Sequence, residues 1–262
     1  LIDNEVLDNV VQNCPSYPSH CYLFLNDVPN ENNADLELMI PKELWNIIIK
    51  VEKHKSLNSE EKSKILNLKQ VILKIFENKK KLSEASARLM CDKIIENPEL
   101  FLCFAAGFTQ VETYAKMAQI IKEENIDVSK IRAIGLDDWV GFGIGDDGSF
   151  YEFINSHVFK PLSIKKEQYF FFDGGNHNPE NECKKANDYL DKYGPLDFII
   201  LGFGLNGPLG FNEPNENPDA RKHIIYLSEQ TKKNIGSYFP GQGVVLTNGM
   251  TLGLGDISKA KD

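Results

Sequence analysis

The sequence has no apolar run long enough to cross a membrane. A membrane-spanning helix needs about 18 or more consecutive apolar residues, and every apolar stretch in these 262 residues is shorter. No signal peptide is recognisable at the start of the chain. Because no apolar run is long enough to span a membrane, we expect no membrane partner. The abrupt beginning at Leu1 and end at Asp262 suggest a fragment.

Positive charge is scarce. The 29 lysines and arginines stand against 38 aspartates and glutamates, which gives a formal net charge of -9. Proteins that bind nucleic acid present a basic face, so we expect no nucleic-acid partner. Any phosphate that binds to this chain must rely on local backbone amides and a few cations.

Cysteine is present, but not in a pattern that indicates disulfides or metal ligands. The five cysteines, at positions 14, 21, 91, 103 and 183, are odd in number and lack paired metal-ligand spacing. Disulfide frameworks occur in oxidising compartments. We therefore expect reduced thiols, a cytoplasmic location, and neither a metal nor another cofactor.

From about residue 69, apolar strands alternate with helical patterns. Strands are predicted at residues 71–76, 100–106, 131–136, 169–172, 197–200, 220–228 and from 244 onward, and helices at 80–96, after 110, at 150–159 and at 180–193. This alternation predicts a doubly wound, mostly parallel sheet with helices on both faces, a Rossmann-like α/β fold.

The first 66 residues do not follow this pattern. Residues 22–25 predict a short strand and residues 41–51 a helix, with an asparagine-rich loop between them. We therefore divide the chain into an N-terminal extension of unknown role, 1–66, and an α/β domain, 67–262.

The most informative stretch is Leu-Gly-Phe-Gly-Leu-Asn-Gly-Pro-Leu-Gly-Phe-Asn-Glu-Pro, residues 201–214. It follows a short apolar run, as expected where a buried parallel strand ends. Ligands of open α/β sheets bind at that edge. The glycines allow close approach to a small molecule, and Asn206 and Glu213 add polar groups. We interpret this stretch as an active-site loop.

Two other strand ends carry polar residues. Gly107, Phe108 and Thr109 open a helix, where free amides favour an anion, although an ordinary turn fits equally. Asp137 and Asp138 follow the next strand and could supply a general base, or else cap a helix. We expect Gly107, Thr109, Asp137, Asn206 and Glu213 to converge on one cleft.

The order Gly-x-Gly-x-Asn-Gly-x-x-Gly-Phe-Asn-Glu-Pro resembles the signature loop of the glucosamine-6-phosphate deaminase and galactosamine-6-phosphate isomerase family. Residues 105–109 are similar to the substrate-phosphate loop of that family. Residues 136–141 resemble its Asp-Glu-Tyr/Trp-Val-Gly motif, and residues 249–257 its last glycine-rich loop. The resemblance covers roughly residues 69–262.

The resemblance implies a small sugar phosphate as substrate and a set of site residues. Asp137 takes the role of the base that moves a proton between C2 and C1 of the open sugar. The catalytic residues implied are Asp137, Asn206 and Glu213, and the substrate contacts implied are Gly107, Phe108, Thr109, Asp138, Gly207, Arg221 and His223. From the residues alone, the basic group at 221–223 is equally typical of a solvated face.

The chain differs from the family pattern at positions that the resemblance assigns to catalysis and phosphate binding. Pro208 stands where the family has its ring-opening histidine, and a proline side chain neither donates nor accepts a proton. Phe108 and Gln110 depart from the usual phosphate loop, and Asp138 replaces a glutamate.

Two hypotheses follow. The first is an active amino-sugar-phosphate isomerase/deaminase. The second is a catalytically weakened homologue that binds sugar phosphate. A 6-phosphogluconolactonase shares the fold, but would lack the Phe-Asn-Glu-Pro segment 211–214. The sequence leaves homo-oligomerisation open.

Overall fold

A four-stranded parallel sheet of order β6-β4-β3-β7 organises the fold. The structure, a computed structural model, describes residues 21–25, 71–76, 78–202, 209–212, 220–221, 223–227, 232 and 246–262. The strands of this sheet are Phe101–Phe104 (β3), Arg132–Gly135 (β4), Tyr169–Phe170 (β6) and Phe198–Ile199 (β7). Strands were predicted at all four positions and are confirmed, each shorter than its apolar run.

Helices connect these strands. They are Lys79–Glu96 (α4), Val111–Glu123 (α5), Phe150–Ile154 (α6), Lys160–Leu162 (α7), Pro179–Tyr193 (α8) and Leu254–Ile257 (α10), with a π-helical turn at Asn155–Phe159 (η1) and a 3-10 turn at Lys166–Gln168 (η2). The predicted helices are confirmed, but the one expected over 150–159 changes to π winding after Ile154. Within the described ranges, no helix is both long and apolar enough to span a bilayer.

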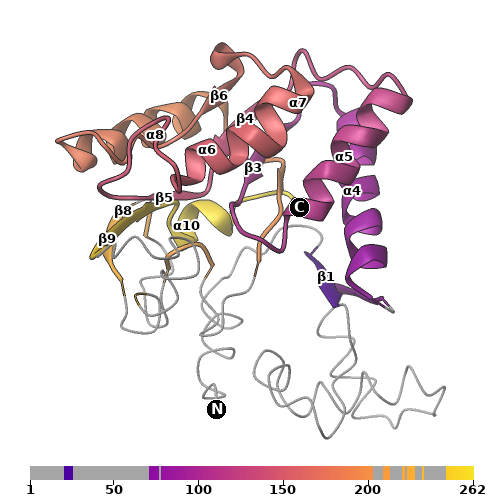
Figure 1. The fold of residues 1–262 in the computed structure, drawn as a ribbon, viewed down its shortest axis with the longest axis horizontal. Coiled ribbons are helices and arrows are strands. Elements are labelled where there is room, and N and C mark those ends of the chain that lie inside the picture. Colours follow the sequence, from indigo (N-terminus) through magenta and orange to yellow (C-terminus); the bar gives the residue numbers. More distant parts are fainter. Residues whose placement is uncertain are drawn as a thin grey trace, which may run out of the picture.

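Helices cover both faces of the sheet, as predicted. One buried cluster joins α4, α5 and η1 to Leu102 and Phe104 of β3, and another joins α8 and α10 to Phe101 and Cys103. Successive residues of a strand point to opposite faces, so the clusters lie on opposite sides of the sheet. Figure 1 shows α4 and α5 packed side by side, with α8 near β8 and β9. The doubly wound α/β fold is therefore confirmed.

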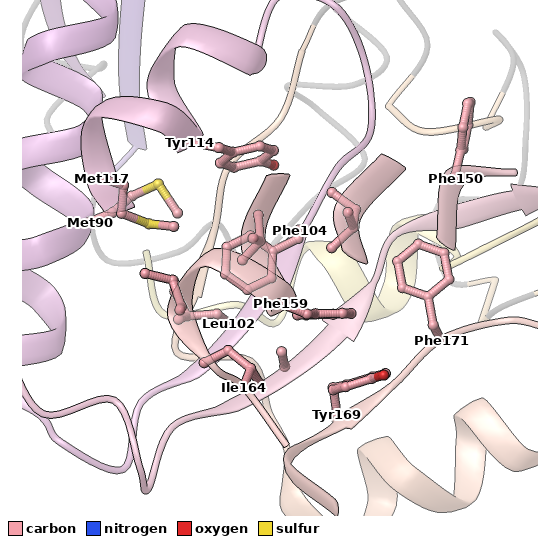
Figure 2. Close-up of a cluster of buried hydrophobic side chains, with 14 of the residues drawn as sticks. Met90, Leu102, Phe104, Tyr114, Met117, Phe150, Phe159, Ile164, Tyr169 and Phe171 are labelled. Carbon is pink, nitrogen blue, oxygen red and sulfur yellow. The ribbon is translucent and has the colours of Figure 1, made fainter. Parts of the chain in front are cut away.

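An aromatic cluster anchors the strand that leads to the first candidate loop. The Phe104 ring meets Tyr114 and Phe159 edge-on, at 5.7 and 6.3 Å between centroids, and Figure 2 shows it lying between them. Phe159 in turn stacks on Tyr169 at 3.9 Å. Edge-on and stacked rings stabilise beyond their buried area. The end of β3 is therefore held in place by α5, η1 and β6.

A second sheet is antiparallel, with order β5-β9-β8. Its strands are Asp137–Trp139 (β5), His223–Tyr226 (β8) and Asn248–Thr251 (β9). The C-terminal strands β8 and β9 therefore pair in a separate antiparallel sheet and do not extend the parallel one. Residues 249–251, expected in a glycine-rich loop, form a strand because β5 and β8 pair with both of their sides. Of the strand expected from residue 244, residues 244–245 lie outside the described residues, and β9 starts after Leu246.

The predicted strand near residue 22 is confirmed as Cys21–Leu25 (β1). It pairs in parallel with Val71–Ile75 (β2), the first predicted strand of the α/β domain. The helix expected over 41–51 lies outside the described residues. The division at residue 66 remains a prediction, and the β1–β2 pairing places part of the extension beside the domain's first strand.

Candidate active site

The site is built at the carboxyl ends of β3, β4 and β7. These strands run in parallel, with Phe104 opposite Gly135 and Cys103 opposite Ile199. Residues that follow the three strands therefore leave the sheet at the same edge, which is where open α/β sheets bind ligands. The segments that follow are the loop at 105–110, the strand β5, and the loop that starts at Leu201.

The loop after β3 makes a tight turn into α5. Gly107 has φ of +142°, and the Gln110 amide donates to the Gly107 carbonyl at 3.0 Å. The Tyr114 hydroxyl donates to the Ala105 carbonyl at 2.7 Å and ties this loop to α5. Gln110, at the start of the helix, forms no side-chain capping bond. The first turn of α5 therefore resembles the helix starts that bind anions.

Thr109 and Phe108 are both exposed on this turn, Phe108 with 57% of its surface. A Cβ built on Gly202 would lie 3.6 Å from the Thr109 Oγ1. The segment that leaves β7 therefore passes directly beside the predicted phosphate contact.

Asp137 is the first residue of β5 and is only 6% exposed. Burial raises its pKa well above the ordinary aspartate value, and the neighbouring charge of Asp138 raises it further. A carboxyl with a raised pKa is a stronger base when ionised than an exposed aspartate, which suits proton abstraction beside a carbonyl. Its position and environment therefore fit the predicted base.

Asp138 points to the other side of β5 and is completely buried. Its carboxylate accepts hydrogen bonds from the amides of Trp139 and Phe150 at 2.8 Å and of Tyr151 at 3.0 Å. Burial raises its pKa to about 7, although the three amides oppose the shift. The helix-cap interpretation of Asp138 therefore accounts for its contacts, and a substrate contact from this side chain stays a prediction.

The far end of the signature loop returns to Asp137. Gly210 has φ of +61°, and a Cβ there would lie 3.2 Å from the Asp137 Oδ2 and 2.6 Å from the Thr251 Oγ1. The loop therefore passes Thr109 at Gly202 and Asp137 at Gly210. Of the predicted loop residues, Asn206, Gly207 and Glu213 lie outside the described residues, as does Pro208.

Two anchors hold this end of the loop. The Phe211 ring packs on Trp139 at 4.6 Å and on Phe150 at 5.8 Å, and fills the space where a Cβ on Gly249 would lie. The Asn212 side-chain amide donates to the carbonyls of Leu209 and Leu252, both at 2.8 Å. These contacts fix the loop end against β5 and β9.

Thr251 is a site residue that the sequence did not single out. It is fully buried on β9, directly opposite Asp137 on β5 and His223 on β8. Its hydroxyl accepts from the Phe211 amide at 3.3 Å and donates to the Leu252 carbonyl at 3.2 Å. The available signal was its position within the glycine-rich stretch 249–257. Thr251 therefore links β5 to the end of the loop.

The two predicted cations lie near β8. The Arg221 guanidinium pairs with Asp191 of α8 at 2.7 Å and with Asp256 of α10 at 3.1 Å. His223 occupies the register position next to Thr251, while its side chain lies outside the described residues. Sugar or phosphate contacts from either residue remain predictions.

The close packing at Gly210 gives a testable expectation for stability. Gly210→Ala adds a methyl group beside two buried oxygens and places a non-glycine residue at positive φ. We expect the free energy of unfolding to fall by about 2–4 kcal/mol, measured by urea denaturation. Gly145→Ala is the matched control, because Gly145 has φ of +92° with nothing within 4 Å of its Cβ position. Equal losses in both variants would show that the contact at Gly210 contributes nothing.

Comparison with known proteins identifies the family. No family model matches the chain. Glucosamine-6-phosphate deaminase 1 of Bacillus subtilis (strain 168) is 32% identical over 180 residues, which covers 69% of this chain and 74% of that protein. A solved structure of a monomeric glucosamine-6-phosphate deaminase is 31% identical with a TM-score of 0.67, over 70% of this chain and 76% of that one.

A more distant group shares the architecture. The 6-phosphogluconolactonase of Thermotoga maritima is 20% identical with a TM-score of 0.52, over 66% of this chain and 72% of that one. This likeness shows a common fold alone. Identity, coverage and the ordered motifs around Asp137 place the chain in a single group: it belongs to the glucosamine-6-phosphate deaminase family.

Proposed function

We propose that this protein is an amino-sugar-phosphate isomerase/deaminase that acts on glucosamine 6-phosphate or its galacto epimer. The observation that carries the proposal is the buried carboxyl of Asp137, with its raised pKa, at the carboxyl edge of the sheet. The signature loop borders this carboxyl at Gly210 and the candidate phosphate turn at Gly202. A base and an anion site joined by one loop suit a phosphorylated sugar.

The geometry suggests a division of roles. Thr109 and the first turn of α5 bind the phosphate, using a hydroxyl and helix-start amides. The ionised Asp137 takes the proton from C2 of the open-chain aldose and returns it to C1, which gives the ketose skeleton. Loss of the amino group as ammonia, with uptake of water, completes the deaminase reaction. Asn206, Glu213 and Gly207 are proposed to complete the site from the same loop.

A weakened, sugar-phosphate-binding homologue is the second candidate. Two residues favour it: Pro208 in place of the ring-opening histidine, and Phe108, exposed on the phosphate turn. The buried base favours the enzyme, because a binding protein gains nothing from burying a carboxyl whose charge is unfavourable there. We propose the enzyme on this ground.

We further propose that the protein works in the cytoplasm. Cys91 and Cys103 are free and buried in the structure. Free thiols persist in reducing compartments, which agrees with the expectation from the cysteine pattern.

The decisive experiment measures both products. Purified protein is incubated separately with glucosamine 6-phosphate and galactosamine 6-phosphate, and ammonia and the ketose 6-phosphate are quantified. Equal amounts of ammonia and ketose phosphate from one epimer would establish the deaminase and its substrate. Binding of both epimers without either product would favour the weakened homologue.

Phosphate recognition can be tested separately from turnover. A ligand that binds only the native state stabilises it by about 2.7 kcal/mol at 100 times its Kd. For a domain of this size, that corresponds to a rise in Tm of roughly 5–10 °C. We expect this rise with a hexose 6-phosphate and a smaller one in Thr109→Ala, measured by thermal shift. An equal rise with the unphosphorylated hexose would remove phosphate recognition from the proposal.

A further inference from the structure

The side chains of the two adjacent aspartates of β5 lie in different surroundings. Consecutive strand residues point to opposite faces, so Asp137 lies beside Gly210 and Thr251 while Asp138 faces the start of α6. We propose that Asp138 is a positioning residue: its carboxylate joins the strand that carries Asp137 to the first turn of α6 and places a second ionisable carboxyl next to the base in the chain. This inference rests on the proposed function, because it takes Asp137 as the base.

The fastening is made by three backbone amides. The Asp138 Oδ1 accepts from Trp139 and Phe150, and Oδ2 from Tyr151. One donor belongs to β5 and two belong to the first turn of α6, so a single carboxylate joins the strand to the helix. Bonds from amides to a charged acceptor are shorter and stronger than neutral ones.

The same helix turn carries one of the anchors of the signature loop. Phe150 packs on Trp139 at 4.8 Å, and both rings contact Phe211. Asp138 therefore holds in one place the base strand and the aromatic residues against which the loop rests. Movement of α6 away from β5 would displace both.

The three amide donors suit a carboxylate, which offers two acceptor oxygens where asparagine offers one. A separate residue, Ser149, accepts from the Glu152 amide at the same helix start. A second buried carboxylate next to Asp137 also has an electrostatic consequence, because like charges in a desolvated site repel each other. The charge of Asp138 therefore acts on Asp137 in addition to capping α6.

The described residues place few other titratable groups near Asp137. Those with an electrostatic interaction with it are Asp138, adjacent on β5, Cys103 on β3 and Tyr114 on α5. Burial raises the pKa of Cys103 and of Tyr114 well above their ordinary values, so both are neutral near pH 7. Asp173, after β6, raises the pKa of Asp138. Among the described residues, Asp138 is thus the ionisable neighbour that raises the pKa of Asp137.

The test follows the carboxyl of Asp137 directly. Its ¹³Cγ signal, assigned by its loss in Asp137→Asn, is titrated by NMR in the wild type and in Asp138→Asn. We expect the midpoint to move to lower pH in Asp138→Asn, because the repelling charge is gone. The acid limb of the pH–rate profile should move in the same direction. Asp138→Glu, which keeps the charge, should leave the midpoint near its wild-type position.

Asp197→Asn is the matched control. Asp197 also accepts a backbone amide, from Phe101 at 2.8 Å, but it lies at the opposite ends of β3 and β7. This variant should leave the Asp137 midpoint unchanged while altering stability. An unchanged midpoint in Asp138→Asn would overturn the proposal and leave Asp138 with a structural role only.

Two further outcomes keep the test decisive. If Asp138→Asn does not fold, the wild-type titration decides: two coupled carboxyls each show a two-step curve, and single independent steps would refute the inference. If the wild type releases no ammonia while the NMR titration shows that Asp137 and Asp138 influence each other's pKa, the proposed function fails and the electrostatic role of Asp138 stands.

Discussion

Asp137→Asn is expected to lower turnover of the amino-sugar phosphate by about 10²–10⁴-fold, the usual contribution of a general acid–base group. Asparagine keeps the shape of the side chain but cannot accept the proton from C2. Binding of the sugar phosphate should persist, because Thr109 and the start of α5 are untouched. The measurements are ammonia release for turnover and thermal shift for binding.

The same variant is expected to be at least as stable as the wild type at neutral pH. The pKa of Asp137 is raised in the folded state. Below the pKa of Asp137 in the unfolded chain, its carboxyl is protonated in both the folded and the unfolded state, so burial carries no cost of neutralising a charge. As pH rises from there toward the folded-state pKa, this cost grows and lowers the free energy of unfolding. Asparagine removes this cost. A variant that loses activity because it has unfolded would contradict this account, and urea denaturation distinguishes the two cases.

Wild-type activity should carry the matching pH signature. The base works only when ionised, so activity falls as pH drops through the folded pKa of Asp137. Because burial and Asp138 raise that pKa, the acid limb of kcat/KM should lie well above the ordinary aspartate range near 4. An acid limb at about pH 4 would exclude Asp137 as the base.

The second large effect is expected at Pro208. If the enzyme is limited by ring opening, Pro208→His restores the imidazole of the family and should raise turnover of the cyclic substrate by about 10²–10⁴-fold. The histidine acts on the closed ring, whereas Asp137 acts afterwards on the open chain. Adding Asp137→Asn to Pro208→His should therefore abolish the gain.

Pro208→Ala is the matched control. It removes the proline, with its restriction on φ and on the preceding Gly207, without adding a proton-transfer group. A gain in the histidine variant alone identifies ring opening as the limiting step. A folded Pro208→His variant that binds sugar phosphate but releases no ammonia, beside an equally silent wild type, would support the weakened homologue.

Local sequence patterns were sufficient for most of the parallel sheet. The apolar runs before Gly107, Asp137 and Gly202 predicted β3, β4 and β7, and helical spacing predicted α4, α5 and α8. These predictions hold because hydrophobic periodicity reports which residues are buried. The second sheet was not predictable in the same way. The pairing of β5 with β9 joins residues more than 100 positions apart, and residues 249–251 look like a loop when read locally.

The candidate site likewise has features that local sequence predicts and features that depend on tertiary contacts. The sequence by itself determined the family and singled out Asp137 as the candidate base, because ordered motifs and the carboxyl ends of parallel strands are local features. Only the tertiary structure placed Gly202 beside Thr109 and Gly210 beside Asp137, revealed the position of Thr251, and distinguished the surroundings of Asp137 from those of Asp138. The physical reason is that burial and hydrogen-bond partners come from segments distant in the chain: two adjacent aspartates look alike in sequence, and the helix and loop packed around them make one a candidate base and the other its support.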